Sequence, residues 1–290
     1  MTSPSAPAEV CRARPLLGTR VEIRAAADWP AARLHAAADA AFEAIQRVQE
    51  RMSFHDPASD VSLLNREALQ RPVQVDGATY SVLAAALDLS RRSGGAFDVA
   101  VGTRLQLWGY LPGGEEPPDG EADWTAIRLL PDCRVRFERP LRIDLGGIAK
   151  GYAVDCAVAS LLRDGVQSAL VNAGGDMRAA GPAPRRIWLR HPDAPALGAH
   201  QLTLCDQALA TSATYFSRRL HGGREVSPLL DPRSGRPCLD GASVSMLAPD
   251  CLHADALTKV VLFAAPVLRD RLLADCGAQA LVQQASAVAA

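Results

Sequence analysis

Lysine is almost absent from this chain. Lys150 and Lys259 are the two lysines among its 290 residues, so 29 of the 31 basic residues (31 minus 2) are arginine. Arginine supplies surface charge equally well, whereas lysine offers a compact point charge that fits beside a phosphate or a carboxylate. The two lysines therefore point to positions where such a charge is needed, with chance retention as the alternative.

Other absences exclude whole classes of protein. The seven cysteines show no CxxC spacing, which argues against a zinc site or a disulfide framework. No apolar run is long enough to span a membrane, and the first 19 residues lack the apolar segment of a signal peptide. A net charge of -1 gives no overall field that would attract nucleic acid. We therefore expect a cytoplasmic protein with reduced thiols, no transmembrane segment and no nucleic-acid partner.

What is present is enough apolar sequence for a folded core. Hydrophobic residues make up 48% of the chain, which allows one large core or two modest ones. The patterns predict helices at 29–52, 78–95, 147–165 and from about 252, with a short helix inside the irregular segment 52–68. They predict strands at 16–27, as a hairpin over 133–145, at 167–181 with a turn at a glycine pair, and at 186–190, 200–209, 242–248 and 279–284.

This order of elements predicts an α+β fold, with layered antiparallel or mixed sheets and helices packed on one side. The segment 111–124 is rich in proline, glycine and acidic residues and cannot form regular structure. Residues 1–290 are expected to form a single unit, and a division into two lobes joined near 111–124 stays open.

The stretch DLGGIAKGYAVD at 144–155 contains the first lysine. A strand that delivers Asp144, two glycines, and a helix carrying Lys150 would form a place for an anion. Unpaired N–H groups at a helix start point outward, and glycines let a ligand approach the main chain. The motif is neither GxxxxGK[ST] nor GxGxxG, so it is weak evidence for nucleotide binding. A tight turn with a surface lysine explains it equally well.

The second lysine lies in CLHADALTKVVLF at 251–263. Asp255 is followed by Thr258 and Lys259 three and four residues later, on the same helix face. A carboxylate, a hydroxyl and main-chain carbonyls are hard oxygen ligands suited to Mg²⁺. The alternative is a capping aspartate with a salt bridge to Lys259.

These stretches belong to a set of blocks that occur in order over nearly the whole chain. They are LGTRVEI (17–23), MSFHDPASDVSLLN (52–65), GAFDVAVG (95–102), IDLGGIAKGYAVD (143–155), LVNAGGDMRAAG (170–181), ATSATYF (210–216), LLDPRSGRP (229–237) and ADALTKVV (254–261). With them the chain resembles the ApbE family of FAD:protein FMN transferases.

The resemblance implies an ApbE-like fold, related to the T-fold, and an enzyme that takes FAD as a substrate. Such an enzyme would use Mg²⁺ at the diphosphate, pass the FMN half to a threonine hydroxyl of an acceptor flavoprotein and release AMP. The implied acceptor is a redox subunit of a quinone reductase or an Rnf complex. The resemblance also leaves a periplasmic or inner-membrane-associated location open.

The family pattern assigns residues to this site by position. The implied FAD-binding residues are Leu17, Phe54, Gly95, Ala96, Phe97, Asp144, Lys150 and Leu229, and the implied metal ligands are the Gly147 carbonyl, Asp255 and Thr258. The residues placed at the chemistry itself are Asp255, Lys259 and His253.

Two departures from the pattern lie close to the chemistry. Lys259 stands where the family often has a threonine, and an ammonium there could replace part of the metal's charge or repel the metal. Pro228 stands where the family has a histidine, which leaves Asp255 or His253 as proton acceptor. Two other functions therefore stay open: hydrolysis of FAD to FMN and AMP, and FAD binding without turnover.

Overall fold

A seven-stranded antiparallel sheet forms the centre of the computed structural model, which describes residues 8–113, 123–192, 194, 196–214 and 217–284. Every neighbouring pair of its strands is antiparallel. In spatial order the strands are β1 (Ala8–Leu16), β2 (Thr19–Ala27), β6 (Ser168–Ala173), β7 (Asp176–Ala180), β10 (Ala208–Ala213), β15 (Ser243–Ala248) and β16 (Gln279–Gln283).

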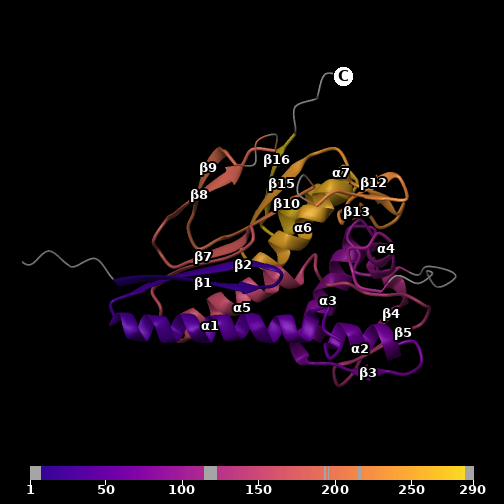
Figure 1. Ribbon diagram of the computed structural model, residues 1–290, viewed down its shortest axis with the longest axis horizontal. Helices are drawn as coiled ribbons and strands as arrows, with labels where there is room; N and C mark the ends of the chain where they lie inside the picture. Colours follow the sequence, from indigo (N-terminus) through magenta and orange to yellow (C-terminus); the bar gives the residue numbers. More distant parts are fainter. Residues whose placement is uncertain (1–7, 114–122, 193, 195, 215–216, 285–290) are drawn as a thin grey trace, which may run out of the picture.

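Three long helices cover one face of this sheet (Figure 1). They are α1 (Ala31–Met52), α5 (Ala149–Arg163) and α6 (Cys251–Phe263). Side chains alternate along a strand, so Val21, Ile23 and Ala25 of β2 are fully buried beneath the helices while Arg24 is exposed. The α+β class and the helices on one side of the sheet are confirmed.

The remaining elements form smaller layers around this centre. At one end of α1 lie α2 (Asp60–Glu67), α3 (Gly77–Arg92), α4 (Gly102–Leu107) and the sheet of β3 (Val73–Gln74), β5 (Arg134–Phe137) and β4 (Ile127–Leu130), as Figure 1 shows. The other elements are a 3-10 turn (Trp124–Ala126), the pairs β8 (Arg185–Arg190) with β9 (Gly198–Leu204), β11 (Arg219–His221) with β12 (Arg224–Val226) and β13 (Leu230–Asp231) with β14 (Arg236–Pro237), and the helix α7 (Pro266–Asp275). One hydrophobic core cluster, with members from Val10 to Ala278, includes residues of the central sheet and its helices and residues of the smaller layers. The predicted joint at 111–124 falls mostly outside the described residues.

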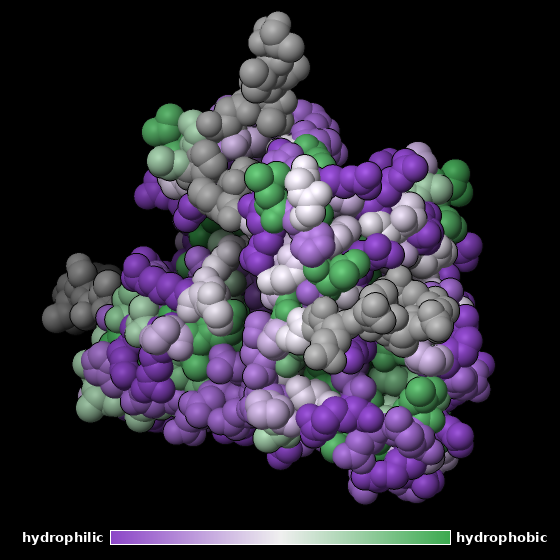
Figure 2. Space-filling view, turned by 45° about the vertical axis from the view of Figure 1, so that its right-hand side comes forward, coloured by the Kyte–Doolittle hydropathy of each residue, from purple (hydrophilic) through white to green (hydrophobic). Residues whose placement is uncertain are grey.

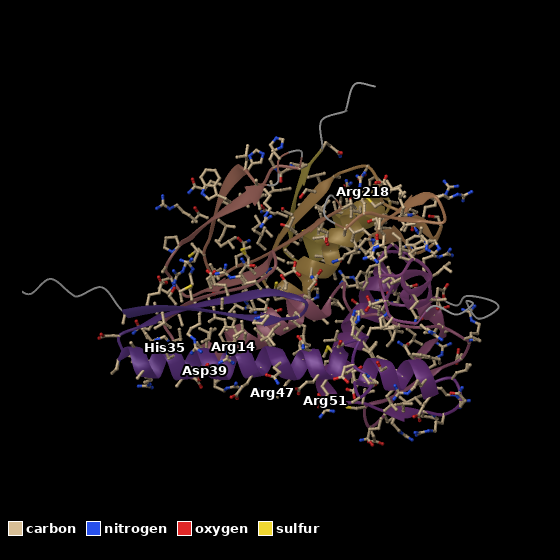
Figure 3. All side chains as sticks on the ribbon, viewed as in Figure 1. Arg14, His35, Asp39, Arg47, Arg51 and Arg218 are labelled. Carbon is tan, nitrogen blue, oxygen red and sulfur yellow. The ribbon has the colours of Figure 1, made fainter. Side chains whose placement is uncertain are left out.

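The first strand pair corrects the sequence analysis, which placed a single strand at 16–27. The chain instead forms the hairpin β1–β2, with its turn at Leu17 (φ 56) and Gly18 (φ 68). A leucine in the left-handed region is uncommon, so the sequence carries no ordinary turn signal here. Arg14 of β1 forms an ion pair with Asp39 of α1, and this pair helps to hold the hairpin on the helix (Figure 3).

The predicted hairpin over 133–145 is also wrong. Of that segment only β5 is a strand, and its partners β4 and β3 both precede it. Residues 138–145 form no ladder. The Asn65 side chain bonds both to the Ile143 carbonyl (2.9 Å) and to the Ile143 N–H (2.8 Å), so an amide takes the place of a neighbouring strand. Asp144 therefore follows an irregular segment and not a strand.

The surface of the protein mixes polar and apolar residues. On the face in Figure 2, hydrophobic residues occur in small groups among hydrophilic ones. None of the helices in the described residues is both long and apolar enough to cross a membrane. All seven cysteines are free thiols in the structure.

Candidate active site

The site lies where α5 and α6 cross. A carboxylate side chain of each helix caps the start of the other helix. Asp155 of α5 accepts the N–H groups of Cys251 (3.0 Å) and Leu252 (2.8 Å) at the start of α6. Asp255 of α6 accepts the N–H of Gly151 in α5 (3.3 Å). Free N–H groups at helix starts are thus satisfied by carboxylates of the neighbouring helix. This exchange fixes the separation of the two lysine-bearing segments.

Both lysines of the chain converge on Asp255, whose side chain is 1% exposed. Lys259 Nζ bonds to the Asp255 carboxylate and to its main-chain carbonyl oxygen (2.9 Å). Lys150 Nζ lies 3.4 Å from the other carboxylate oxygen of Asp255 and bonds to Asp176. The predicted anion-binding lysine is therefore held by two carboxylates.

Burial and charge shift the pKa values of this cluster in opposite directions. Burial works against ionisation of Asp255, but the two ammonium groups outweigh it and hold the pKa of Asp255 below its usual range. Burial, with the Asp255 charge, raises the pKa of Asp176. Despite its own burial, Lys150 has a raised pKa because both carboxylates stabilise its charged form. Lys150 is therefore protonated at neutral pH.

A small cavity of about 70 Å³ lies beside this cluster and gathers many of the predicted residues. Burial raises the pKa of the Asp144 carboxyl in its wall. The predicted residues that line the cavity are Ala96, Phe97, Asp144, Gly147, Leu229 and Lys259, and Pro228 also lines it. Residues from four separate sequence blocks thus meet at one place.

A larger cavity of about 440 Å³ adjoins the first and shares Asp98 and Leu230 with it. Predicted Gly95 lines it together with Trp124 and Arg233. This volume lies in the range that holds small-molecule ligands. An aromatic ring, a guanidinium and main-chain glycine are suited to a flat heteroaromatic group.

A larger hollow, of about 890 Å³, lies elsewhere. It is lined by Thr211 and by residues of β2, β6 and β8. The neighbouring Ser212 points the other way, because its hydroxyl bonds to Thr258 of α6 (2.7 Å). This hollow is therefore on the outer face of the central sheet, away from the lysine cluster.

Six predicted residues line neither of the two adjoining cavities: Lys150, Asp255 and Thr258 in and beside the lysine cluster, and Leu17, Phe54 and His253. Leu17 is in the β1–β2 turn, where its N–H donates to the Gln49 side chain (2.5 Å), and Phe54 packs against the main core. The His253 ring lies 2.8 Å from Asp250, the residue that caps α6. For His253 this contact favours a role in holding the capping residue Asp250 over the predicted role as proton acceptor.

The predicted Mg²⁺ ligands do not fit a metal ion as they are arranged. Both carboxylate oxygens of Asp255 face lysine ammonium groups. The Thr258 hydroxyl donates to the Asp255 carbonyl (2.6 Å) and also contacts Ser212. Among the described residues, no group of three or more His, Cys, Asp or Glu side chains could hold a metal. Mg²⁺ stays a prediction of the resemblance.

Asp98 was missed as a site residue, although it lies inside the block GAFDVAVG. It lines both cavities and accepts the N–H groups of Ala100 (2.8 Å) and Trp124 (3.1 Å). Burial raises its pKa to about 6, from 3.8 in an unperturbed carboxyl. No feature of the sequence block distinguishes this aspartate from a surface one.

Asp98→Asn is expected to change how stability depends on pH. A raised carboxyl pKa favours the folded state below the unfolded pKa, and that contribution is lost as the pH rises through the folded pKa. A shift of this size corresponds to about 3 kcal/mol. Relative to the asparagine variant, the wild type should lose about this much unfolding free energy in urea titrations between about pH 3.5 and 7. The matched control is Asp132→Asn, at a side chain that is 83% exposed. It should leave the pH dependence of the unfolding free energy as in the wild type.

The fold and the site define a class of protein: an α+β protein with a charged cluster and adjoining cavities at the start of two crossing helices. Within that class, the chain belongs to the ApbE family, whose model matches residues 17–282. It is an enzyme of the transferase class.

Curated relatives carry a common name. An FAD:protein FMN transferase of Treponema pallidum is 31% identical over 281 residues, which cover 86% of this chain and 77% of the relative. An FAD:protein FMN transferase of Klebsiella pneumoniae is 32% identical over 241 residues, covering 78% of this chain and 75% of the relative.

Solved structures confirm the ApbE-like fold. The crystal structure of the ApbE protein of Thermotoga maritima superposes with a TM-score of 0.84 at 28% identity and covers 96% of this chain and 97% of that one. The flavin transferase ApbE of Vibrio cholerae gives a TM-score of 0.76 at 25% identity, covering 95% and 93%.

Proposed function

We propose that this chain transfers the FMN moiety of FAD to a threonine hydroxyl of an acceptor flavoprotein and releases AMP. The observation that carries the proposal is the convergence of Lys150, Lys259 and the cavity residues of four blocks at one crossing of helices. The names of the family relatives support the same reaction.

The proposed step is a displacement at phosphorus. The threonine oxygen forms a bond to the phosphorus of the FMN phosphate, and the bond from that phosphorus to the bridging oxygen breaks. AMP leaves with the bridging oxygen. The hydroxyl proton passes to a carboxylate, for which we assign Asp144, because it lines the cavity and burial raises its pKa. Asp255 is less suited, because the two ammonium groups lower its pKa and so make its carboxylate a weaker base.

The chain's own groups position the diphosphate and balance its charge. The start of α5 has no side-chain cap at Ile148, and although the Gly151 N–H bonds to Asp255, the positive end of the helix dipole there favours an anion. Lys150 in its first turn adds a fixed positive charge, and Lys259 adds a second from α6. Stabilising charge that develops on the transferring phosphoryl group is the main work of a protein in this chemistry.

Lys150→Met is expected to weaken FAD binding by about 10- to 100-fold, the loss of one charge-assisted hydrogen bond. Isothermal titration calorimetry measures this. The control Arg163→Met changes an exposed residue at the far end of the same helix and should bind FAD as the wild type does. Unchanged affinity in Lys150→Met would remove Lys150 from the diphosphate site.

Incubation with FAD and a redox subunit that bears a candidate threonine tests the reaction itself. The resemblance suggests subunits of the quinone reductase or Rnf type. The proposal predicts that the acceptor gains the mass of one covalently bound FMN and that AMP is released in equal amount. Free FMN with AMP and an unmodified acceptor would indicate hydrolysis instead, and intact FAD would indicate binding alone. A threonine-to-alanine acceptor should stay unmodified.

A further inference from the structure

Lys259 lies at the position that the predicted metal ligands surround. A Cβ atom built on Gly147 would be 3.4 Å from Lys259 Cε and 3.8 Å from its Nζ. The same ammonium bonds to the carboxylate and the carbonyl oxygen of Asp255. Gly147 and Asp255 are two of the three implied metal ligands, so a positive charge of the chain itself already lies between them.

The surroundings hold this ammonium in place. The Lys259 side chain is only 15% exposed, and its stem follows one turn of α6 from Asp255 to the small cavity. An ammonium has three N–H donors. Two of them point at oxygen atoms of Asp255, and the third can bind an oxygen of a ligand in the cavity that Lys259 lines.

Lys150 does not duplicate this arrangement. Its ammonium bonds to Asp176, its side chain is 35% exposed, and Lys150 is absent from the lining of either adjoining cavity. A divalent cation at Asp255 would be repelled by the nearby Lys259 charge and would have to compete for the same carboxylate oxygen. The two lysines therefore differ in placement: Lys150 adds its charge at the start of α5 while bonded to Asp176, whereas Lys259 lines the cavity itself.

We propose that the Lys259 ammonium is a built-in cation that takes the place of a divalent metal ion at the FAD diphosphate. This inference rests on the proposed function, in that it assigns the charge partner of the same substrate. FAD binding to this chain is then independent of Mg²⁺. Replacing Lys259 by an oxygen-bearing residue creates a need for the metal.

FAD titrations of the wild type in EDTA and in excess Mg²⁺ give the first test, which needs no variant. The expected dissociation constants agree within about twofold. Lys259→Met, which keeps the apolar stem without the charge, should bind FAD about 10- to 100-fold more weakly in both buffers. Lys259→Thr should bind equally weakly in EDTA and recover when Mg²⁺ is added, because a hydroxyl oxygen is an acceptable ligand for Mg²⁺. A wild type that needs Mg²⁺ to bind FAD would overturn the proposal.

Binding of Mn²⁺, followed by its electron paramagnetic resonance signal, gives a second test that uses no FAD. Lys259→Thr should bind Mn²⁺ at Asp255, and the wild type should leave Mn²⁺ free at the same concentration. The opposite result would be that the wild type binds Mn²⁺ as tightly as the threonine variant does and that Asp255→Asn abolishes that binding. In that case the metal binds at Asp255 despite the Lys259 ammonium, and the proposal is wrong. Failure of FAD binding in every buffer would count against the proposed function, and the Mn²⁺ result would still decide the role of Lys259.

Discussion

Asp255→Asn should slow transfer strongly and also destabilise the fold. The carboxylate joins both lysines of the chain to the start of α5, and it is almost fully buried. Its removal leaves two ammonium groups without their common partner, which costs about 3 to 5 kcal/mol of unfolding free energy. The transfer rate should fall by about 100- to 1000-fold, because the positive charges are no longer positioned at the diphosphate.

Urea unfolding and the acceptor mass assay measure the two effects separately. Asp250→Asn is the matched control at the start of the same helix: asparagine caps a helix about as well as aspartate, so the change should cost less than about 1 kcal/mol and leave the transfer rate nearly unchanged. The double variant Asp255→Asn with Lys259→Met should regain part of the lost stability, since it removes one unpaired charge. A single variant as stable and active as the wild type would show that the cluster is not the centre of the site.

Gly151→Ala should have the largest effect on stability. A Cβ at this position would lie 2.1 Å from the carbonyl oxygen of Cys251 and 2.9 Å from the Leu252 nitrogen, both main-chain atoms of α6. The helices must therefore move apart, and the exchange between Asp155, Asp255 and the two helix starts is lost. We expect a loss of about 4 kcal/mol or more in unfolding free energy.

Gly77→Ala is the control for this glycine. Gly77 begins α3, and no atom lies within 4 Å of the Cβ that the change would add. The substitution should be neutral or raise the unfolding free energy by about 0.5 kcal/mol. Equal urea midpoints for Gly151→Ala and Gly77→Ala would refute the close crossing of α5 and α6.

Sequence patterns predicted the elements whose signals are local. The helix at 31–52 follows from its apolar periodicity, and the helix predicted at 78–95 ends as α3 just before Gly94, where the chain takes a positive φ. The β1–β2 hairpin was missed because its turn contains Leu17 in a conformation that leucine rarely adopts. A side-chain amide that substitutes for a strand, as Asn65 does at Ile143, has no sequence signature.

The site was predicted in part for a related reason. The family blocks singled out Lys150, Asp255 and Lys259, and the structure places all three in one cluster. The partner of Lys150 was not foreseen, because Asp176 is 26 residues away and meets it only through the packing of α5 on β7. Asp155 likewise caps a helix about 96 residues later. Pairings at such separations depend on the tertiary fold, which a single sequence does not reveal.

A crystal structure of the chain with bound FAD, grown without divalent metal, tests the account most directly. The account predicts that the diphosphate lies between the start of α5 and α6, with one of its oxygen atoms within hydrogen-bonding distance of Lys259 Nζ. A diphosphate bound in the hollow on the outer face of the central sheet, with the lysine cluster unchanged, would contradict it.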